Sequence, residues 1–292
     1  MDTASIARLG IDDLAACLDL AADRRWPRAR RKWSFLLTVG EGFGLRDSVD
    51  GDQGAASDRE PASDPGEELV GSVILSRFDP RLAWVGMMLV ASKWNGRGLG
   101  RTLMRHAMQE ARTDIIGLHA TPDGLPLYRK LGFRAVGPVL THRGHFTGPR
   151  DRTGRTRPFT YADLDAVRAL DAEITGSDRR DLLAGYLRFA GHLRVLEAGG
   201  VITGYAGSWR DGDIVVIGPV LAATLADATD LIADVASTVD GEVRLDTEHA
   251  SLAAWAAAHG IAPWFESTCM VYGGDLPGDR SRLFTPVMQA LG

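Results

Sequence analysis

The chain has little of what marks secreted, disulfide-bonded or membrane-spanning proteins. Only two of its 292 residues are cysteines, Cys17 and Cys269, and they lie far apart, so we expect two free thiols in a reducing compartment. The longest apolar runs, such as residues 214–223, are too short to span a bilayer. The first ten residues include Asp2 and lack the apolar core of a signal peptide. These absences predict a cytoplasmic protein with no membrane partner.

Histidine and cysteine are not grouped at the spacing of a metal site. His142 and His145 form an isolated pair, which we interpret as loop histidines, and neither cysteine is interpreted as a nucleophile. We therefore expect no metal cofactor.

The net charge of −5 comes largely from one segment. Residues 46–68 hold eight acids and two arginines, are rich in Asp, Gly, Ser, Ala and Pro, and have almost no large apolar side chain. This composition predicts a disordered, solvated insertion between strands at residues 42–45 and 69–78.

Positive charge gathers at residues 24–32, next to Trp26 and Trp33. A basic stretch mixed with aromatic residues can bind nucleic acid. The chain as a whole is acidic and carries no nucleic-acid motif, so no nucleic-acid partner is expected. With 45% hydrophobic and 24% charged residues, the chain can bury a large core and is long enough for two domains.

The most informative stretch is residues 89–109, where an apolar strand runs through a glycine-rich turn into an amphipathic helix. Gly96, Gly98 and Gly100 let consecutive backbone amides converge. The start of the helix adds unpaired donors and the positive end of its dipole. The sequence therefore predicts a binding site for a pyrophosphate.

Spacing excludes two familiar nucleotide-binding turns. A mononucleotide P-loop ends in Gly-Lys-Ser/Thr, whereas Gly100 is followed by Arg101 and Thr102. A dinucleotide fingerprint requires an acid at the end of the next strand, and the strand predicted at residues 115–120 ends without one.

A second motif follows at residues 118–133, which read LHATPDGLPLYRKLGF. The strand predicted at 85–90, the turn at 95–100, the strand at 115–120 and a short helix ending in Leu-Tyr-x-Lys-Leu-Gly-Phe together resemble the acetyl-CoA-binding core of the GNAT N-acetyltransferase superfamily. One position departs from the family pattern, because Asn95 stands where relatives usually have Gln or Arg.

The composition changes again at residues 142–158, which are polar, basic and rich in Gly and Pro, as is typical of an interdomain linker. The later sequence repeats the earlier order of elements. We predict helices at 162–172, 181–189, 223–237 and 252–259, and strands at 192–197, 201–210, 214–221, 243–247 and 267–272. In this second copy, residues 222–228 contain no glycine, and Ala256 stands opposite Tyr128. The copy resembles the degenerate C-terminal domain of tandem GNAT proteins.

The resemblance implies an α/β (α+β) fold with two tandem GNAT-like domains, each a mixed, mostly antiparallel twisted sheet flanked by helices. We place an acetyl-CoA-binding N-terminal GNAT domain at residues 1–146, a linker at 147–158 and the degenerate domain at 159–292. The second domain is expected to shape the acceptor pocket rather than to bind a second cofactor.

The resemblance also implies which residues bind the cofactor and which carry the reaction. The backbone of the strand before the turn pairs with the pantetheine arm, the turn holds the pyrophosphate, and one residue before the short helix touches the cofactor. The residues at these positions are Met88, Leu89 and Val90; Asn95, Gly96, Arg97, Gly98, Leu99, Gly100 and Arg101; and Thr121. Tyr128 matches the family tyrosine near the cofactor sulfur, so it is expected to protonate the departing thiolate as general acid.

The general base is less evident, because many relatives use a Glu on the strand before the turn and residues 82–90 contain no acid. Glu41, His119 and Asp123 remain candidates, and we select His119 because histidine ordinarily titrates near neutrality. In the family the first two helices border the acceptor pocket, which makes Trp26, Trp33 and Glu41 candidate pocket residues. Both tryptophans are equally compatible with a place in the hydrophobic core.

The sequence thus predicts an acetyl-CoA-dependent N-acetyltransferase that acts on a primary amine of a small molecule bound between the two domains, in a monomer or homodimer. A peptide or protein amine is a further possible acceptor. The alternative is a non-catalytic protein that responds to acyl-CoA or binds a partner, which the departure at Asn95 and the missing strand acid favour.

Overall fold

The computed structural model describes residues 5–48, 67–148 and 154–292, and the chain forms two compact units. The first comprises residues 1–76 and 85–112, and the second comprises residues 77–84 and 113–292. Most of the predicted acidic insertion lies outside the described residues. Its two ends, residues 46–48 and 67–68, belong to strands that are longer than predicted.

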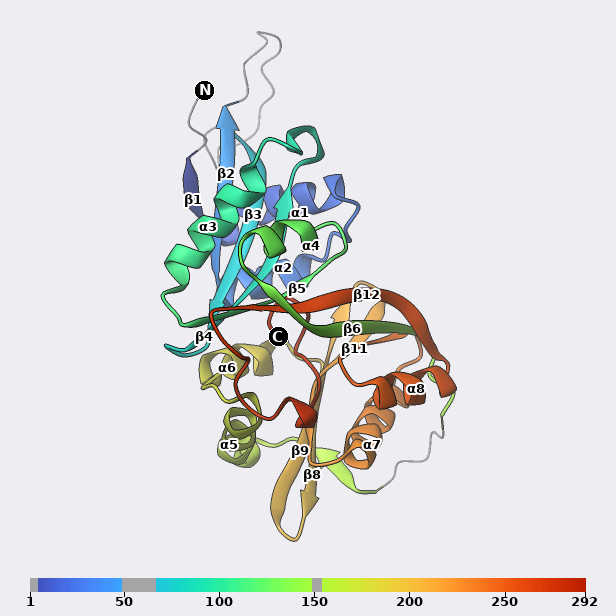
Figure 1. The fold of residues 1–292 in the computed structure, drawn as a ribbon. Helices are drawn as coiled ribbons and strands as arrows, with labels where there is room; N and C mark the ends of the chain where they lie inside the picture. Colours follow the sequence, from blue (N-terminus) through green and yellow to red (C-terminus); the bar gives the residue numbers. More distant parts are fainter. Residues whose placement is uncertain (1–4, 49–66, 149–153) are drawn as a thin grey trace. The chain divides into compact units, whose positions relative to one another are not determined.

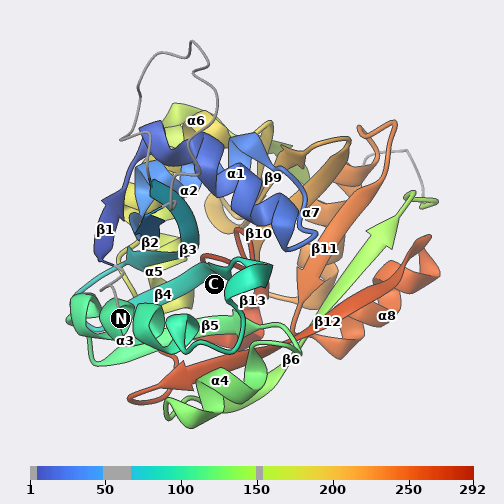
Figure 2. The same ribbon diagram turned by 90° about the horizontal axis from the view of Figure 1, so that it is seen from above.

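The first unit is an antiparallel sheet with helices on both faces (Figure 1). Its strands, in spatial order, are β1 (Ile6–Leu9), β2 (Glu41–Ser48), β3 (Glu67–Arg77) and β4 (Leu82–Val90), whose first three residues count with the second unit. Its helices are α1 (Leu14–Asp23), α2 (Arg30–Val39) and α3 (Leu99–Ala111), with short 3-10 turns η1 (Ile11–Asp13) and η2 (Ser92–Trp94). Figure 2 shows α1 and α2 on one face of these strands and α3 on the other.

The apolar spacing of α3 fixes its orientation. Leu103, Met104, Ala107 and Ala111 are buried and recur every three or four residues, so one stripe of the helix packs on the sheet. This packing aims the helix N-terminus, and with it the glycine turn, at the end of β4.

The second unit contains the rest of the chain, and its strand order is β5-β12-β6-β11-β10-β9-β8-β7, with β13 paired to β10. The strands are β5 (Ile115–Ala120), β6 (Arg134–Gly144), β7 (Thr156–Pro158), β8 (His192–Ala198), β9 (Val201–Asp211), β10 (Ile214–Ala222), β11 (Val243–Thr247), β12 (Ile261–Tyr272) and β13 (Leu283–Thr285). The helices are α4 (Leu125–Lys130), α5 (Leu164–Thr175), α6 (Arg180–Phe189), α7 (Leu225–Ala236) and α8 (Ala250–Ala258), with 3-10 turns η3 (Tyr161–Asp163) and η4 (Arg280–Arg282).

The side chains of β8 and β9 point alternately to the two faces of the sheet, and this divides the core of this unit into two layers. Val195 and Tyr205 pack with apolar residues of α5 and α6, whereas Leu196 and Ala206 pack with residues of α7. Neighbouring residues of a strand face opposite sides, so the helices cover both faces of these strands (Figure 1).

Strand β12 of the second repeat is inserted between two strands of the first. β12 pairs with β5 on one side and β6 on the other, and β6 in turn pairs with β11 (Figure 1). Residues 113–146 therefore share a compact unit with the second repeat. The linker predicted at 147–158 separates the two sequence repeats, whereas the compact units divide at other residues, so this linker stays a prediction.

Two expectations from the sequence are wrong in detail here. His142 is not a loop histidine, because it lies inside β6 and is only 3% exposed. β12 starts six residues before the strand predicted at 267–272. Its first half contains Pro263 and a register shift, and leaves Trp264 and Phe265 exposed, so the alternation that reveals a strand is missing.

Among the described residues, no helix is both long and apolar enough to cross a membrane.

Candidate functional site

The glycine turn between β4 and α3 presents an uncapped helix N-terminus to solvent. Gly96 and Gly98 adopt φ values of +77° and +83°, a left-handed conformation that glycine reaches without strain. Gly98 is the N-cap of α3, and no side chain caps it. Among the described residues, the amides of residues 96–100 donate to no acceptor. The turn therefore offers several free N–H groups at the positive end of a helix, as an anion requires.

Positive side chains add to this arrangement. Arg97 and Arg101 are exposed, and the Arg97 guanidinium lies 4.4 Å above the ring of Trp94. Stacking on the indole holds the cation beside the turn.

An exposed carboxylate, Asp23 at the end of α1, anchors the entry to the turn. Its carboxylate accepts hydrogen bonds from the Ser92 amide at 2.6 Å and the Ser92 hydroxyl at 2.7 Å. These two bonds, the hydroxyl first, lower the pKa of Asp23. Ser92 lies three residues before Asn95, so Asp23 fixes the entry to the turn.

We expect Asp23→Ala to weaken acetyl-CoA binding up to about tenfold at pH 7, since such hydrogen bonds contribute on the order of 1 kcal/mol. Because folding lowers the pKa of Asp23, its contribution to stability is present at neutral pH and is lost as the pH falls through the acid range. Urea unfolding should therefore separate the variant from the wild type at pH 7 and bring them together as the pH falls below the lowered pKa of Asp23. Asp178→Ala, which removes an exposed carboxylate from the second unit, is the control for the binding titration; equal weakening by both variants would contradict the anchoring role.

The strand that leads into the turn contains a backbone irregularity that the sequence analysis missed. Met87 has φ +51°, which a residue with a side chain adopts only under strain. Its carbonyl is held by the buried Ser72 hydroxyl at 3.0 Å. Strain of this kind occurs at functional sites, and it immediately precedes the predicted pantetheine-binding residues. Gly86, one position earlier, is the only local sign of it.

Tyr128 lies in α4, and its ring is buried. The residue is 8% exposed, and its ring meets Phe133 edge to face at 6.0 Å. A Cβ on Gly124 would lie 2.9 Å from Tyr128 Cε2, so that glycine leaves the room the ring occupies. Among the described residues, no group hydrogen-bonds the Tyr128 hydroxyl. Burial raises the pKa of Tyr128, so the phenol is protonated and available as a donor.

Thr121 forms the turn that starts α4. Its carbonyl accepts the amides of Gly124 and Leu125, both at 3.0 Å. Thr121, the residue that follows β5, thus fixes the start of α4, the helix that carries Tyr128.

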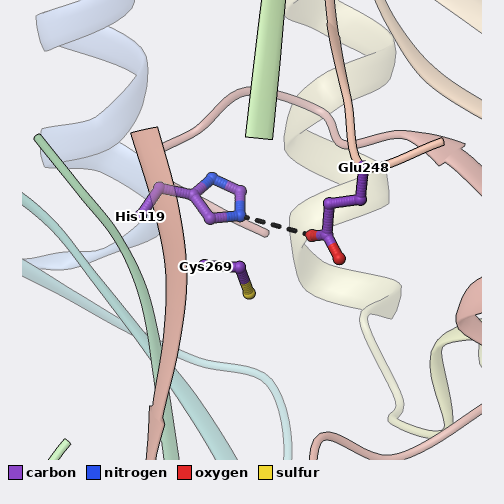
Figure 3. Close-up of side chains that lie close together, drawn as sticks. All are labelled: His119, Glu248 and Cys269. Carbon is purple, nitrogen blue, oxygen red and sulfur yellow. Dashed lines mark ion pairs between the residues drawn. The ribbon is translucent and has the colours of Figure 1, made fainter. Parts of the chain in front are cut away.

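His119 points into a buried cluster with Glu248 and Cys269 (Figure 3). The His119 side chain is 1% exposed, and its Nε2 lies 3.6 Å from Glu248 Oε1. The ring also meets Trp84 edge to face at 5.0 Å. Glu248 forms an ion pair with Arg280. Although burial alone pushes the other way, the neighbouring His119 and Arg280 side chains bring the pKa of Glu248 down to about 2. Burial, together with Glu248, raises the pKa of the Cys269 thiol to about 12.

Sequence reasoning missed Glu248 and Arg280 because both lie in the second repeat, far from His119 along the chain. The available signal was an acid directly after the strand 243–247, which corresponds to the strand 115–120 in the repeat. Nothing local to His119 points to it.

The remaining predicted site residues fall into separate parts of the chain. Trp26, Trp33 and Glu41 belong to the first unit, whereas His119 and Asp123 belong to the second. Trp33 is fully buried in α2, so it fills the hydrophobic core. Trp26 is half-buried between α1 and α2, Glu41 is paired with Arg8, and Asp123 is exposed.

In the second repeat the corresponding helix N-terminus is capped, and strand β13 lies against β10. Thr224 caps α7 by accepting the Asp227 amide at 3.2 Å, and Asp227 adds a negative charge where an anion would sit. β10 and β11 pair only near Val215 and Val216 before they separate. Beyond that point β13 pairs with β10 at Val220 and Leu221. The chain itself therefore occupies the edge of β10 that β11 has left.

Comparisons with known proteins agree with this geometry. Two profiles described as "Acetyltransferase (GNAT) domain" match residues 167–285 and 59–135. An uncharacterized N-acetyltransferase of Bacillus subtilis, YitH, is 25% identical, and the match covers 98% of each chain. A holothin acyltransferase of a Pseudoalteromonas species is 27% identical over 57% of each chain.

A crystal structure from Pyrococcus horikoshii, of a protein provisionally designated an acetyltransferase, superposes with a TM-score of 0.77 at 18% identity. The superposition covers 99% of this chain and 95% of the other. The predicted fold class is confirmed. With a GNAT profile matched in each half and an N-acetyltransferase relative matched along the whole chain, this protein belongs to the GNAT acetyltransferase superfamily in its tandem form and is an acyltransferase.

Proposed function

We propose that this chain transfers an acetyl group from acetyl-CoA directly to the primary amine of a small molecule. The observation that carries the proposal is the uncapped, exposed N-terminus of α3, with its two left-handed glycines and free amides. The equivalent α7 is capped and lacks the glycines. One cofactor per chain follows from this difference.

Acetyl-CoA is the cosubstrate of GNAT proteins, and the turn of the first repeat is suited to its pyrophosphate. Residues 96–100, flanked by Asn95 and Arg101, supply the free amides, and Arg97 and Arg101 supply positive charge. Residues 88–90, directly after the strained Met87, are proposed to pair their backbone with the pantetheine arm. Thr121 lies at the start of α4 and is proposed to touch the same arm.

The reaction requires a polarised thioester, a neutral amine and a proton for the departing sulfur. A backbone amide of residues 88–90 is proposed to donate to the thioester oxygen, where negative charge develops. Tyr128 is proposed to protonate the sulfur, since its hydroxyl is neutral and has no hydrogen-bond partner in the described part of the chain.

The acceptor is proposed to bind between the first and second repeats. Residues of the second repeat, Glu248 and Arg280, extend to His119 at the end of β5. The relation to a holothin acyltransferase supports a substrate other than a protein.

The experiment is a thiol-release assay with acetyl-CoA against a panel of primary amines, with matched secondary amines, alcohols and a short peptide as controls. We expect CoA release with at least one small primary amine and a product heavier by one acetyl group. Release with the peptide alone would indicate a protein acceptor. Tight binding of acetyl-CoA without release to any amine would favour the alternative of an acyl-CoA sensor.

A further inference from the structure

The sheet around β5 separates Tyr128 from His119. Tyr128 contacts Phe133, and Phe133 contacts Tyr272 at 5.5 Å, so the β12 residue Tyr272 faces the α4 side. Tyr272 pairs with Ile116, and paired residues share a face. His119 lies three positions further along β5, on the opposite face. The cluster of Figure 3 thus lies on the face away from the proposed acid.

The second repeat supplies nearly every polar group that faces His119. Glu248 follows β11, Cys269 pairs directly with His119 from β12, and Arg280 comes from η4. Trp84 of β4 supplies an apolar wall. The positive charge of Arg280 balances the negative charge of Glu248. As long as His119 is uncharged, the cluster is therefore electrically neutral without a further ion.

The His119 ring lies close to Glu248 without a hydrogen bond to it. Both ring nitrogens are buried and neither has a hydrogen-bond partner within normal distance. The nearest acceptor, Glu248 Oε1 at 3.6 Å, is slightly beyond a hydrogen bond and close enough to stabilise a positive charge on the ring. Glu248 is 22% exposed, which opens the pair to solvent at the carboxylate.

We propose that His119 accepts the proton of the acceptor ammonium and that Glu248, from the second repeat, is the residue that positions it and stabilises its charged form. The inference rests on the proposed function. The ammonium gives one proton to His119 Nε2. The amine nitrogen then bonds to the thioester carbon while the carbon–sulfur bond breaks. Tyr128 gives its proton to the sulfur, the second amine proton passes to water, and water returns a proton to Tyr128. His119 then releases its own proton to solvent.

The first test is the pH profile of kcat/KM for the best amine of the panel, in the wild type, Glu248→Gln and His119→Gln. Removing the carboxylate makes the ring harder to protonate, so Glu248→Gln should lower kcat about tenfold and move the acid limb to lower pH. His119→Gln should remove that limb. The acetyl-CoA Kd should stay unchanged in both. Glu173→Gln, which breaks a surface ion pair with Arg282, is the matched control. A Glu248→Gln profile that overlays the wild type, in a folded protein, would overturn the proposal.

The second test needs no turnover. NMR of ¹⁵N-histidine-labelled protein reports the titration midpoint of His119, which should fall in Glu248→Gln and stay in Glu173→Gln. An unchanged midpoint would overturn the proposal. One zinc ion per chain in the purified protein, lost in Cys269→Ser, would also overturn it, because the three side chains lie close enough to share an ion. If the wild type acetylates no amine, the proposed function fails. The NMR midpoints then decide by themselves whether Glu248 stabilises the charged form of His119.

Discussion

Gly98→Trp is expected to raise the acetyl-CoA Kd at least 100-fold, about 3 kcal/mol of binding free energy. Gly98 has φ +83°, which a residue with a Cβ reaches only at a cost of roughly 1–2 kcal/mol. The indole would also occupy the open space next to the free amides of residues 96–100, where nothing lies within 4 Å of a Cβ at present. The variant therefore loses both the shape of the turn and the room for a pyrophosphate. Isothermal titration measures the effect.

Gly200→Trp is the matched control for this variant. Gly200 has φ +78° and also has nothing within 4 Å of a Cβ, but it lies in the hairpin between β8 and β9. It should show the same backbone strain and retain normal acetyl-CoA affinity. Equal loss of binding in the two variants would mean that strain alone disturbs the protein, and normal binding by Gly98→Trp would remove the turn from the cofactor site.

Tyr128→Phe is expected to lower kcat about 100-fold to 1000-fold while the acetyl-CoA Kd stays unchanged, since general acid catalysis contributes on this order. The hydroxyl makes no hydrogen bond to the described protein, so its removal should change the free energy of unfolding by less than about 0.5 kcal/mol. Single-turnover kinetics separates the chemical step from cofactor binding.

Tyr186→Phe gives the opposite pattern and serves as the control. The Tyr186 hydroxyl donates to the Gly218 carbonyl at 2.5 Å in the core of the second repeat. Its loss leaves that carbonyl unpaired and should cost about 1–3 kcal/mol of stability, with kcat of the folded protein near the wild-type value. A Tyr128→Phe variant that is destabilised and catalytically normal would reduce Tyr128 to a packing residue.

Local sequence signals predicted most of what lies along the chain. The glycine turn depends on alternating glycines at the start of an amphipathic helix, and α3 starts at Leu99, directly after Gly98. β5 and β11 have the predicted bounds, because short apolar strands between polar turns are visible in the sequence. The Leu-Tyr-x-Lys-Leu-Gly-Phe motif placed Tyr128 in a short helix, as found.

Features that depend on contacts between distant segments were not predictable in this way. The pairing of β12 with both β5 and β6 leaves no local pattern, because strand partners are chosen by burial of whole faces. The strained backbone of Met87 depends on Ser72 from another strand. Glu248 reaches His119 only because the second repeat packs there. Trp33 was equally hard to place, because an aromatic residue next to basic residues can face either a pocket or the core. The structure buries it fully in the core.

The central claim is that one turn in one repeat binds acetyl-CoA. Isothermal titration of acetyl-CoA into the wild-type chain tests it most directly. We expect a stoichiometry of one per chain, because α3 has free amides and α7 is capped by Thr224 while β13 occupies the gap beside β10. Two sites per chain, or no binding at all, would contradict it.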